Sequence, residues 1–205
     1  MILEGVVTTL DPTGELNVAP MGPRLFAPYS LEVGSVLVLK PFASSRTAAN
    51  LRHHPEGVFH VTDDVLLLAQ AAIGRVSPPT LPTLAVQGRR LADTCRAYEF
   101  SLIQSQCDWM QERLQLPAVV RVVHRQRDFF GFNRAKHAVV EAAILATRTQ
   151  LLPAEQVYSE FERLAVLIDK TAGEQEREAF ALLRQYVESA YARLKPLSPE
   201  SIAQS

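Results

Sequence analysis

The sequence contains few cysteines and almost no excess of either charge. Cys95 and Cys107 are its only cysteines, which are too far apart for a C-x-x-C motif and too few for a disulfide framework. Their scarcity favours a reduced protein of the cytoplasm. The 21 basic residues are balanced by 22 acidic ones, so no broad positive field would attract nucleic acid or an anionic membrane. Any anion-binding site must therefore be local.

Long hydrophobic runs are also missing. No segment approaches the length of a membrane-spanning helix, and the N-terminus lacks a basic stretch before an apolar core. We therefore predict a protein that is neither membrane-embedded nor exported. His53, His54 and His60 do not match a zinc-binding spacing, so no metal site is predicted. The hydrophobic fraction of 47% is sufficient for a packed core and argues against disorder.

The pattern of residues 1–130 predicts short β-strands separated by turns. Residues 2–10 are rich in β-branched side chains, and a proline and a glycine in residues 11–15 predict a tight turn into residues 16–22. A nearly continuous apolar run at 33–39 predicts a strand buried on both faces. Further strands are predicted at 58–61, 98–106 and 118–129, with a proline-rich loop at 76–82. Many short strands at this spacing predict a barrel.

Helices are predicted inside this β region and after it. Ser45 is a natural N-cap for a short helix over 47–54, and Asp63 for another over 65–73. From residue 131 the pattern changes to three helical segments, which Pro153 and Gly173 separate. We therefore predict an α+β protein. Its parts are a β domain over 1–130, a helical domain over 131–196 and a flexible tail over 197–205.

A polar cluster precedes the first short helix. Ser44, Ser45, Arg46 and Thr47 combine three hydroxyl groups, a guanidinium and the N–H groups of a helix N-terminus, a set that suits a phosphate monoester. A simple N-cap followed by a solvated arginine explains the same residues. This stretch alone does not decide between the two interpretations.

Four stretches stand in a distinctive order along the chain. They are NVAPMG in the second predicted strand, S-R-T-x-x-N-L after a core strand, VFHVTDD, and FGFNRAKHAVVEAAILATR at the start of the helical part. This order resembles the FMN-binding split-barrel superfamily of flavin reductases, and in particular one uncharacterised family with a C-terminal helical domain. The resemblance implies an FMN-binding split β-barrel followed by a helical domain. It also implies FMN as the cofactor and a homodimer that holds the flavin between its barrels.

The same resemblance implies roles for individual residues. The phosphate would be bound by Ser45, Arg46 and Thr47, with Ser44 and Asn50 as further candidates. The flavin ring would be lined by Ala19, Pro20, Met21 and Gly22, where proline and glycine allow the backbone to approach closely and Met21 offers a polarisable side chain. The polar edge of the ring would be closed by Thr62 and Asp63.

The start of the first long helix is a further candidate. Asn133 is a natural N-cap, and His137 and Glu141 lie one i,i+4 step apart on the same face. His137 is the candidate catalytic residue, because its side chain titrates near neutral pH. The resemblance also places Asn133 among the cofactor-binding candidates. A capped helix with a surface histidine–glutamate pair explains the same pattern.

Three arginines precede that helix. Strand alternation predicts that Arg121, Arg125 and Arg127 share one face with Val123 and Phe129. Such a row of guanidinium groups would receive a multiply charged substrate. A solvated barrel exterior is the alternative, since exposed strand faces are often charged.

The functional prediction is an FMN-dependent oxidoreductase whose small-molecule substrate is unknown. FMN would carry the redox chemistry, and the protein would bind and orient it. Two alternatives stay open, because no catalytic signature stands out. One is a non-enzymatic flavin or haem carrier or sensor, and the other is a partner-binding protein whose helical domain supplies the interaction surface.

Overall fold

The computed structural model describes residues 1–194, so the predicted tail over 197–205 lies outside the described residues. The chain divides into two compact units, one over Met1–Gly131 and one beginning at Phe132. Both cysteines are free thiols. Among the helices of residues 1–194, none combines the length and hydropathy that a membrane span requires.

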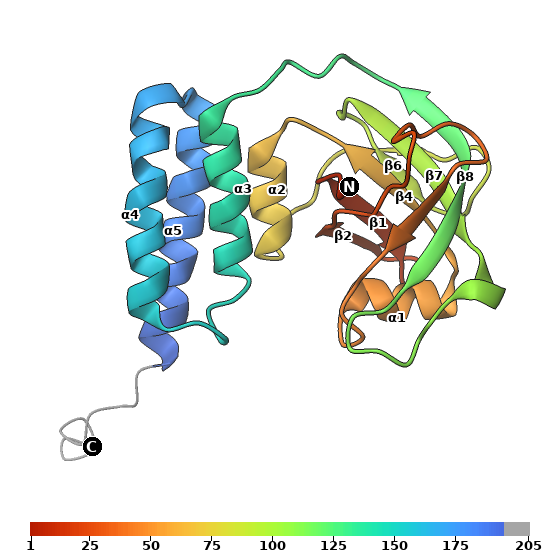
Figure 1. Ribbon diagram of the computed structural model, residues 1–205, viewed down its shortest axis with the longest axis horizontal. Helices are drawn as coiled ribbons and strands as arrows, with labels where there is room; N and C mark the ends of the chain where they lie inside the picture. Colours follow the sequence, from red (N-terminus) through yellow and green to blue (C-terminus); the bar gives the residue numbers. More distant parts are fainter. Residues whose placement is uncertain (195–205) are drawn as a thin grey trace. The chain divides into compact units, whose positions relative to one another are not determined.

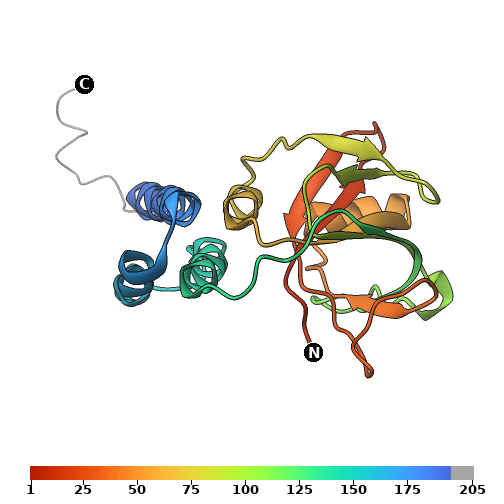
Figure 2. The same ribbon diagram turned by 90° about the horizontal axis from the view of Figure 1, so that it is seen from above.

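The first unit is built on one antiparallel sheet with the strand order β2-β1-β4-β7-β8-β3 (Figure 1). Its strands are β1 (Val6–Leu10), β2 (Leu16–Pro20), β3 (Val36–Leu39), β4 (Glu56–Val61), β7 (Arg96–Leu102) and β8 (Leu116–Arg125). A separate ribbon pairs β5 (Thr80–Pro82) with β6 (Arg89–Leu91). The sheet curls into a half-open barrel (Figure 2), and Arg24 bridges β3 to the segment before β1.

The β1–β2 hairpin confirms the predicted turn. Leu10 pairs with Leu16, and the Asp11 carboxylate closes the turn by accepting the backbone N–H groups of Thr13 and Glu15, both at 2.9 Å. An aspartate that bonds to the backbone just ahead of it is the usual device of such a turn. The hairpin register is therefore set by local chemistry.

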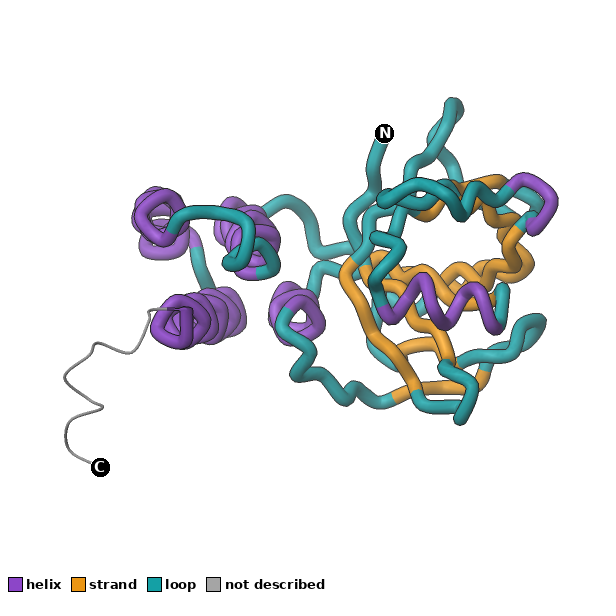
Figure 3. The backbone as a smooth tube through the Cα atoms, turned by 90° about the horizontal axis from the view of Figure 1, so that it is seen from below, coloured by secondary structure: helices purple, strands orange, loops and turns teal. Residues whose placement is uncertain are grey.

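Helix α1 (Arg46–His53) packs against β1 and β2 and fills one side of the barrel (Figure 3). Ala48 and Leu51 are buried in the same core cluster as Phe59 and Phe100. Ser45 is the N-cap, as predicted, and its hydroxyl accepts from the Ala48 N–H at 3.2 Å. Because a helix this short is marginal alone, its burial in the barrel core supplies most of its stability.

The second short helix, α2 (Val65–Ala72), corrects one predicted cap. Its N-cap is Asp64, whose carboxylate accepts from the Leu67 N–H at 2.9 Å, and not Asp63. The neighbouring Asp63 carboxylate accepts instead from the Phe130 N–H at 2.9 Å. Two adjacent aspartates make the cap ambiguous in sequence, and a contact 67 residues away decides between them.

Several strand boundaries also differ from the prediction. Gly34 adopts a positive φ of 87°, a turn conformation that favours glycine, so Val33 lies outside β3 and is 67% exposed. Residues 80–82, predicted as loop, form β5, because the two-stranded ribbon has an outer edge that tolerates proline. Strand β7 stops at Leu102, and a short 3₁₀ helix, η1 (Gln104–Gln106), follows.

A buried charge lies on the outer face of the sheet, beneath the loop that joins β5 to β6. The Glu99 side chain is fully buried and accepts from the backbone N–H groups of Leu84 and Ala85, each at 2.7 Å. His124 Nε2 lies 2.7 Å from the same carboxylate. Burial alone would raise the pKa of Glu99, but the hydrogen bonds from Ala85, His124 and Leu84 outweigh burial and lower that pKa.

Residues 132–194 of the second unit contain three helices, as predicted: α3 (Arg134–Ala146), α4 (Ala154–Thr171) and α5 (Glu174–Leu194). Each helix contacts the other two. Asn133 caps α3 by accepting from the N–H groups of Ala135 and Lys136, and its side-chain amide donates to the Thr171 carbonyl at 3.1 Å. Asn133 therefore both starts α3 and attaches it to the end of α4.

Replacing Glu99 with Gln should destabilise the barrel unit by about 3 kcal/mol at pH 7, because a buried carboxylate that contacts His124 and two backbone N–H donors is lost. A glutamate with a lowered pKa contributes stability above the ordinary carboxyl pKa and loses it in acid. The difference between wild type and Glu99→Gln should therefore shrink below about pH 4. Urea unfolding followed by Trp109 fluorescence measures this, since Trp109 is the only tryptophan.

The matched control is Glu32→Gln. Glu32 is 61% exposed in its side chain and lies 3.7 Å from Arg125, so its loss should cost less than about 0.5 kcal/mol. Equal destabilisation by the two substitutions would contradict a special role for Glu99.

Candidate functional site

The predicted phosphate residues lie where α1 begins, beside the turn of the β1–β2 hairpin. Thr47 is buried, and its hydroxyl oxygen accepts from the Asn17 side-chain amide at 3.1 Å. Asn50 is buried as well and donates to the Thr9 hydroxyl at 3.0 Å. Asn17 also reaches Thr9 at 3.3 Å. We call these four residues the helix–hairpin network; it attaches α1 to both strands of the hairpin.

Arg46 is an exposed cation at the start of α1, and its guanidinium has two acidic partners. Its guanidinium lies 2.9 Å from Glu15 and 3.3 Å from Asp11, with half of the side chain exposed. The hydrogen bond and charge of Glu15 raise the pKa of Arg46. Hydrogen bonds from the Thr13 hydroxyl and the Glu15 backbone are the main reasons that the pKa of Asp11 is lowered to about 2. Exposed ion pairs contribute little to stability, so an anionic ligand can compete for this guanidinium.

Backbone donors stand beside Arg46. The first N–H groups of a helix have no intrahelical acceptor, and in α1 Ser45 satisfies only that of Ala48. Within the described residues, the N–H groups of Arg46 and Thr47 have no acceptor. The exposed Ser44 hydroxyl precedes them. A helix N-terminus with a nearby guanidinium is a chemically suitable place for a phosphate group.

The predicted ring-binding segments meet at the opposite end of the hairpin. Val6 of β1 pairs with Pro20 on one side and with His60 on the other. The ends of β2 and β4 therefore lie at the same end of the sheet, and Thr62 and Asp63 follow directly.

The hairpin sets the distance between the two predicted parts of the site. From the Leu10–Leu16 pair beside α1 to the Val6–Pro20 pair is four residues of strand, or about 13 Å. An elongated ligand with a phosphate at one end and a ring at the other matches this arrangement.

The four residues predicted to line the flavin ring differ in their exposure and in what they contact. Ala19 is partly buried and Pro20 is exposed. The Met21 side chain is partly buried and packs against the barrel core. A Cβ atom at Gly22 would lie 2.5 Å from Ile2 Cγ2. Glycine is therefore required there by the neighbouring Ile2 side chain, whether or not a ligand binds.

Asp63 belongs to an ion-pair cluster, and both oxygens of its carboxylate have partners within the chain. Arg127 lies 2.6 Å from Asp63 and 2.6 Å from Asp93, and the Phe130 N–H donates to the second Asp63 oxygen. Burial would raise the pKa of Asp63, but the hydrogen bonds from Arg127 and Phe130 hold it at about 2. Thr62 accepts from the Asp64 N–H through its hydroxyl. The cluster therefore fixes residues 127–130 beside the end of β4.

The three arginines of the predicted row do not share one face. Val122 pairs with Glu99 and Val120 with Phe100, which leaves Arg121 as the extra residue of a β-bulge and reverses the alternation beyond it. Arg127 lies past the end of β8. Arg125 is paired with Glu32. The predicted row was wrong because one bulge shifts the period of two.

The candidate residues of α3 belong to the second unit. Asn133 is committed to capping, and His137 is exposed. In the part of the chain that the structure describes, no hydrogen bond or ion pair joins His137 to Glu141. The same residues contain no group of three or more histidine, cysteine, aspartate or glutamate side chains placed to hold a metal ion.

Sequence reasoning missed the Glu99–His124 pair and the Asp63–Arg127 pair. Both join residues far apart in the chain, on different elements. A glutamate inside an otherwise apolar strand, YEF, was the one available signal for Glu99, since a buried carboxylate requires partners.

Two family models match this sequence. A model described as the N-terminal domain of a protein of unknown function (DUF447) matches residues 3–125, and a second DUF447 model matches residues 133–185. Together they span well over half of the sequence. The chain belongs to the DUF447 family. A comparison with curated proteins found no match.

Solved structures show the fold of this DUF447 protein. The FMN-bound protein MM1853 of Methanosarcina mazei, also assigned to DUF447, has a TM-score of 0.77 at 20% identity and covers 90% of this chain and 94% of its own. An FMN-binding protein of Thermus thermophilus, solved with p-hydroxybenzaldehyde, has a TM-score of 0.51 at 13% identity over 60% of this chain and 71% of its own. The predicted split-barrel fold with a C-terminal helical region is confirmed.

A double-mutant cycle tests the Asp63–Arg127 cluster. Asp63→Asn and Arg127→Gln should show a coupling energy of about 1–2 kcal/mol at pH 7, because the Asp63 carboxylate is buried while Arg127 is one third exposed. Since the pKa of Asp63 is lowered to about 2, the coupling should persist down to about pH 4 and disappear as the pH falls towards 2. Urea unfolding with Trp109 fluorescence provides the free energies.

The Glu32–Arg125 pair supplies the control cycle. Both side chains are more than 60% exposed, so the coupling between them should stay below about 0.5 kcal/mol. A coupling near zero for Asp63 and Arg127 would mean that the cluster is only a surface pair.

Proposed function

We propose that this DUF447-family protein binds FMN on its barrel unit and uses it as an oxidoreductase acting on a small molecule. The arrangement at α1 is the observation that carries the proposal. A helix N-terminus with open backbone donors and an exchangeable guanidinium lies one hairpin length, about 13 Å, from the ends of β2 and β4. The FMN-bound relative with the same fold supports the choice of ligand.

Each part of the chain would have a defined task. Arg46, Ser44 and Ser45, with the N–H groups of Arg46 and Thr47, would hold the phosphate. Backbone groups of Ala19–Gly22 and of Thr62 and Asp63 would border the ring. Thr47 and Asn50 would act through the helix–hairpin network, which holds the donors in place. When bound, FMN would supply the electron-transfer chemistry, and His137 stays a candidate proton donor on its chemistry alone.

Arg46 provides the direct prediction for the phosphate site. Arg46→Ala should weaken FMN binding roughly 10- to 100-fold, because a charge-assisted contact to phosphate is lost. Glu15→Gln should change affinity in the opposite direction, since it removes a carboxylate that competes for the same guanidinium. FMN titration by flavin fluorescence measures both effects.

Arg75→Gln is a matched control, because Arg75 is also exposed and lies after α2. Its FMN affinity should equal that of the wild type. Unchanged affinity in Arg46→Ala, with wild-type thermal stability, would remove Arg46 from the site.

Purification tests the function itself. The protein should carry a yellow cofactor whose released mass is that of FMN, and NADH or NADPH should bleach it if the protein is a reductase. A yellow protein that neither nicotinamide reduces, and that dithionite does reduce, would favour the carrier or sensor alternative. A colourless protein with no affinity for FMN would overturn the proposal.

We also propose a homodimer formed by the barrel unit. Large apolar side chains are exposed there, including Phe26, Val33, Phe42 and Met110, and exposed apolar side chains are typical of association surfaces. Sedimentation at micromolar concentration should give twice the chain mass of 22.7 kDa. A monomer that retains FMN would contradict the dimer and leave the FMN site intact.

A cytoplasmic location completes the proposal. Cys95 is a buried free thiol and Cys107 is a partly buried one, and unpaired thiols are typical of reducing compartments. Cell fractionation would test it, and recovery of the protein outside the cytoplasm would contradict it.

A further inference from the structure

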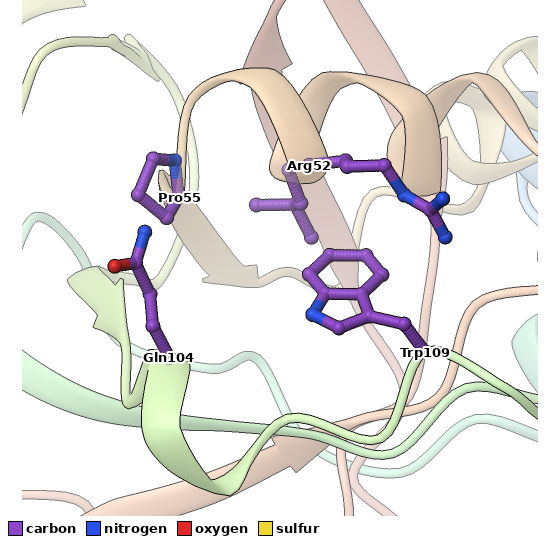
Figure 4. Close-up of a pocket in the computed structure, with 5 residues that line it drawn as sticks. Arg52, Pro55, Gln104 and Trp109 are labelled. Carbon is purple, nitrogen blue, oxygen red and sulfur yellow. The ribbon is translucent and has the colours of Figure 1, made fainter.

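A hollow lies at the C-terminal end of α1, at the other end of the helix from the proposed phosphate site. It has a volume of about 320 Å³ and is lined by Leu51, Arg52, Pro55, Gln104 and Trp109. Figure 4 shows the Trp109 indole below the helix, with Arg52 on one side and Gln104 and Pro55 on the other. We call it the Trp109 pocket.

Three of the five residues that line the Trp109 pocket are apolar, namely Leu51, Pro55 and Trp109. Leu51 is fully buried and Trp109 packs against the barrel core, so both are held in place from behind. Pro55 adds a ring that cannot rotate. Flat, preformed apolar walls of this kind suit a planar ring, because little conformational freedom is lost on binding.

The polar groups at its rim are mainly donors, and Arg52 makes a cation–π contact with Trp109. The Arg52 guanidinium lies 4.9 Å from the centre of the Trp109 ring, and no carboxylate of residues 1–194 pairs with it. Within the same described residues, the indole N–H of Trp109 and the amide of Gln104 make no hydrogen bond. An uncompensated guanidinium with two further donor groups favours an anion.

This pocket is separate from the proposed FMN site. Arg46 and Arg52 are six residues apart on α1, which corresponds to about 9 Å along the helix axis. The FMN phosphate would lie at the helix N-terminus, whereas the Trp109 pocket lies at the C-terminus. The pocket also shares no lining residue with the predicted flavin contacts.

We propose that the Trp109 pocket binds a small planar aromatic carboxylate. The ring of the ligand lies against the indole and Pro55, and its carboxylate pairs with Arg52. Gln104 and the indole N–H supply the remaining hydrogen bonds. The volume accommodates one or two fused rings, which is the size of a substrate or regulator and not of FMN.

Trp109 fluorescence reports directly on this pocket, because the chain has no other tryptophan. Benzoate added to the protein as purified should change that fluorescence saturably, with a dissociation constant on the order of 0.1–1 mM. Benzamide, which has the same ring without the charge, should bind at least about 10-fold more weakly. Arg52→Gln should weaken benzoate binding by about 10-fold or more, and Arg52→Lys by less.

Arg75→Gln is the matched control, since Arg75 is likewise exposed and lies outside the pocket; it should bind benzoate as the wild type does. Bound flavin absorbance should stay constant through the titration. Loss of that absorbance would place benzoate in the flavin site and overturn a separate pocket. Absence of saturation up to about 10 mM, or equal affinity in Arg52→Gln, would overturn the proposal while leaving FMN binding unaffected.

Discussion

The helix–hairpin network of Thr9, Asn17, Thr47 and Asn50 is the interaction on which the site depends. These four polar side chains are buried or partly buried at the junction of α1 with β1 and β2, and each forms a hydrogen bond with another of the four. An unsatisfied group at this depth would cost more than one hydrogen bond contributes. The network therefore admits few alternative positions of α1. Its geometry places the helix N-terminus beside the hairpin turn and the helix C-terminus beside Trp109.

Arg46 shows how local electrostatics can serve both the free and the bound protein. The turn that Asp11 closes also brings Asp11 and Glu15 against the guanidinium. Because these pairs are exposed, they neutralise the cation without holding it tightly. An incoming phosphate would exchange two carboxylates for one dianion at a helix N-terminus, which adds backbone donors that the carboxylates do not use. Arg46 would then prefer phosphate to the two carboxylates because phosphate also reaches the backbone N–H groups of the helix, and because it carries more charge than either carboxylate.

Two buried carboxylates of the barrel unit, Glu99 and Asp63, each hold a loop in place. On the outer face, Glu99 holds the β5–β6 loop through backbone N–H groups. At the end of β4, Asp63 holds residues 127–130 through Arg127 and the Phe130 N–H. Both carboxylates have lowered pKa values despite burial, which requires several donors for each. Each therefore fixes a loop that apolar packing alone would leave free to move.

The sequence by itself determined the features that rest on local chemistry. The turn after Leu10, the Ser45 and Asn133 caps, and the helix breaks at Pro153 and Gly173 each depend on residues within one turn of the chain. The order of the motifs was enough to predict the split-barrel fold, because three of the four motifs lie in core strands or shortly after them. Local patterns also located the phosphate candidates at the start of α1.

Only the tertiary structure decided which polar residues meet. Asp64, and not Asp63, caps α2 because Asp63 is engaged by Arg127, a residue remote in sequence. The bulge at Arg121 arises from the register between β7 and β8, which no alternation within β8 reveals. Glu99 and His124, Arg46 and Glu15, and Arg52 and Trp109 are likewise brought together by the curl of the sheet and the placement of α1. Pairing between distant residues depends on how the whole core packs, and a sequence pattern reports only the preferences of neighbouring residues.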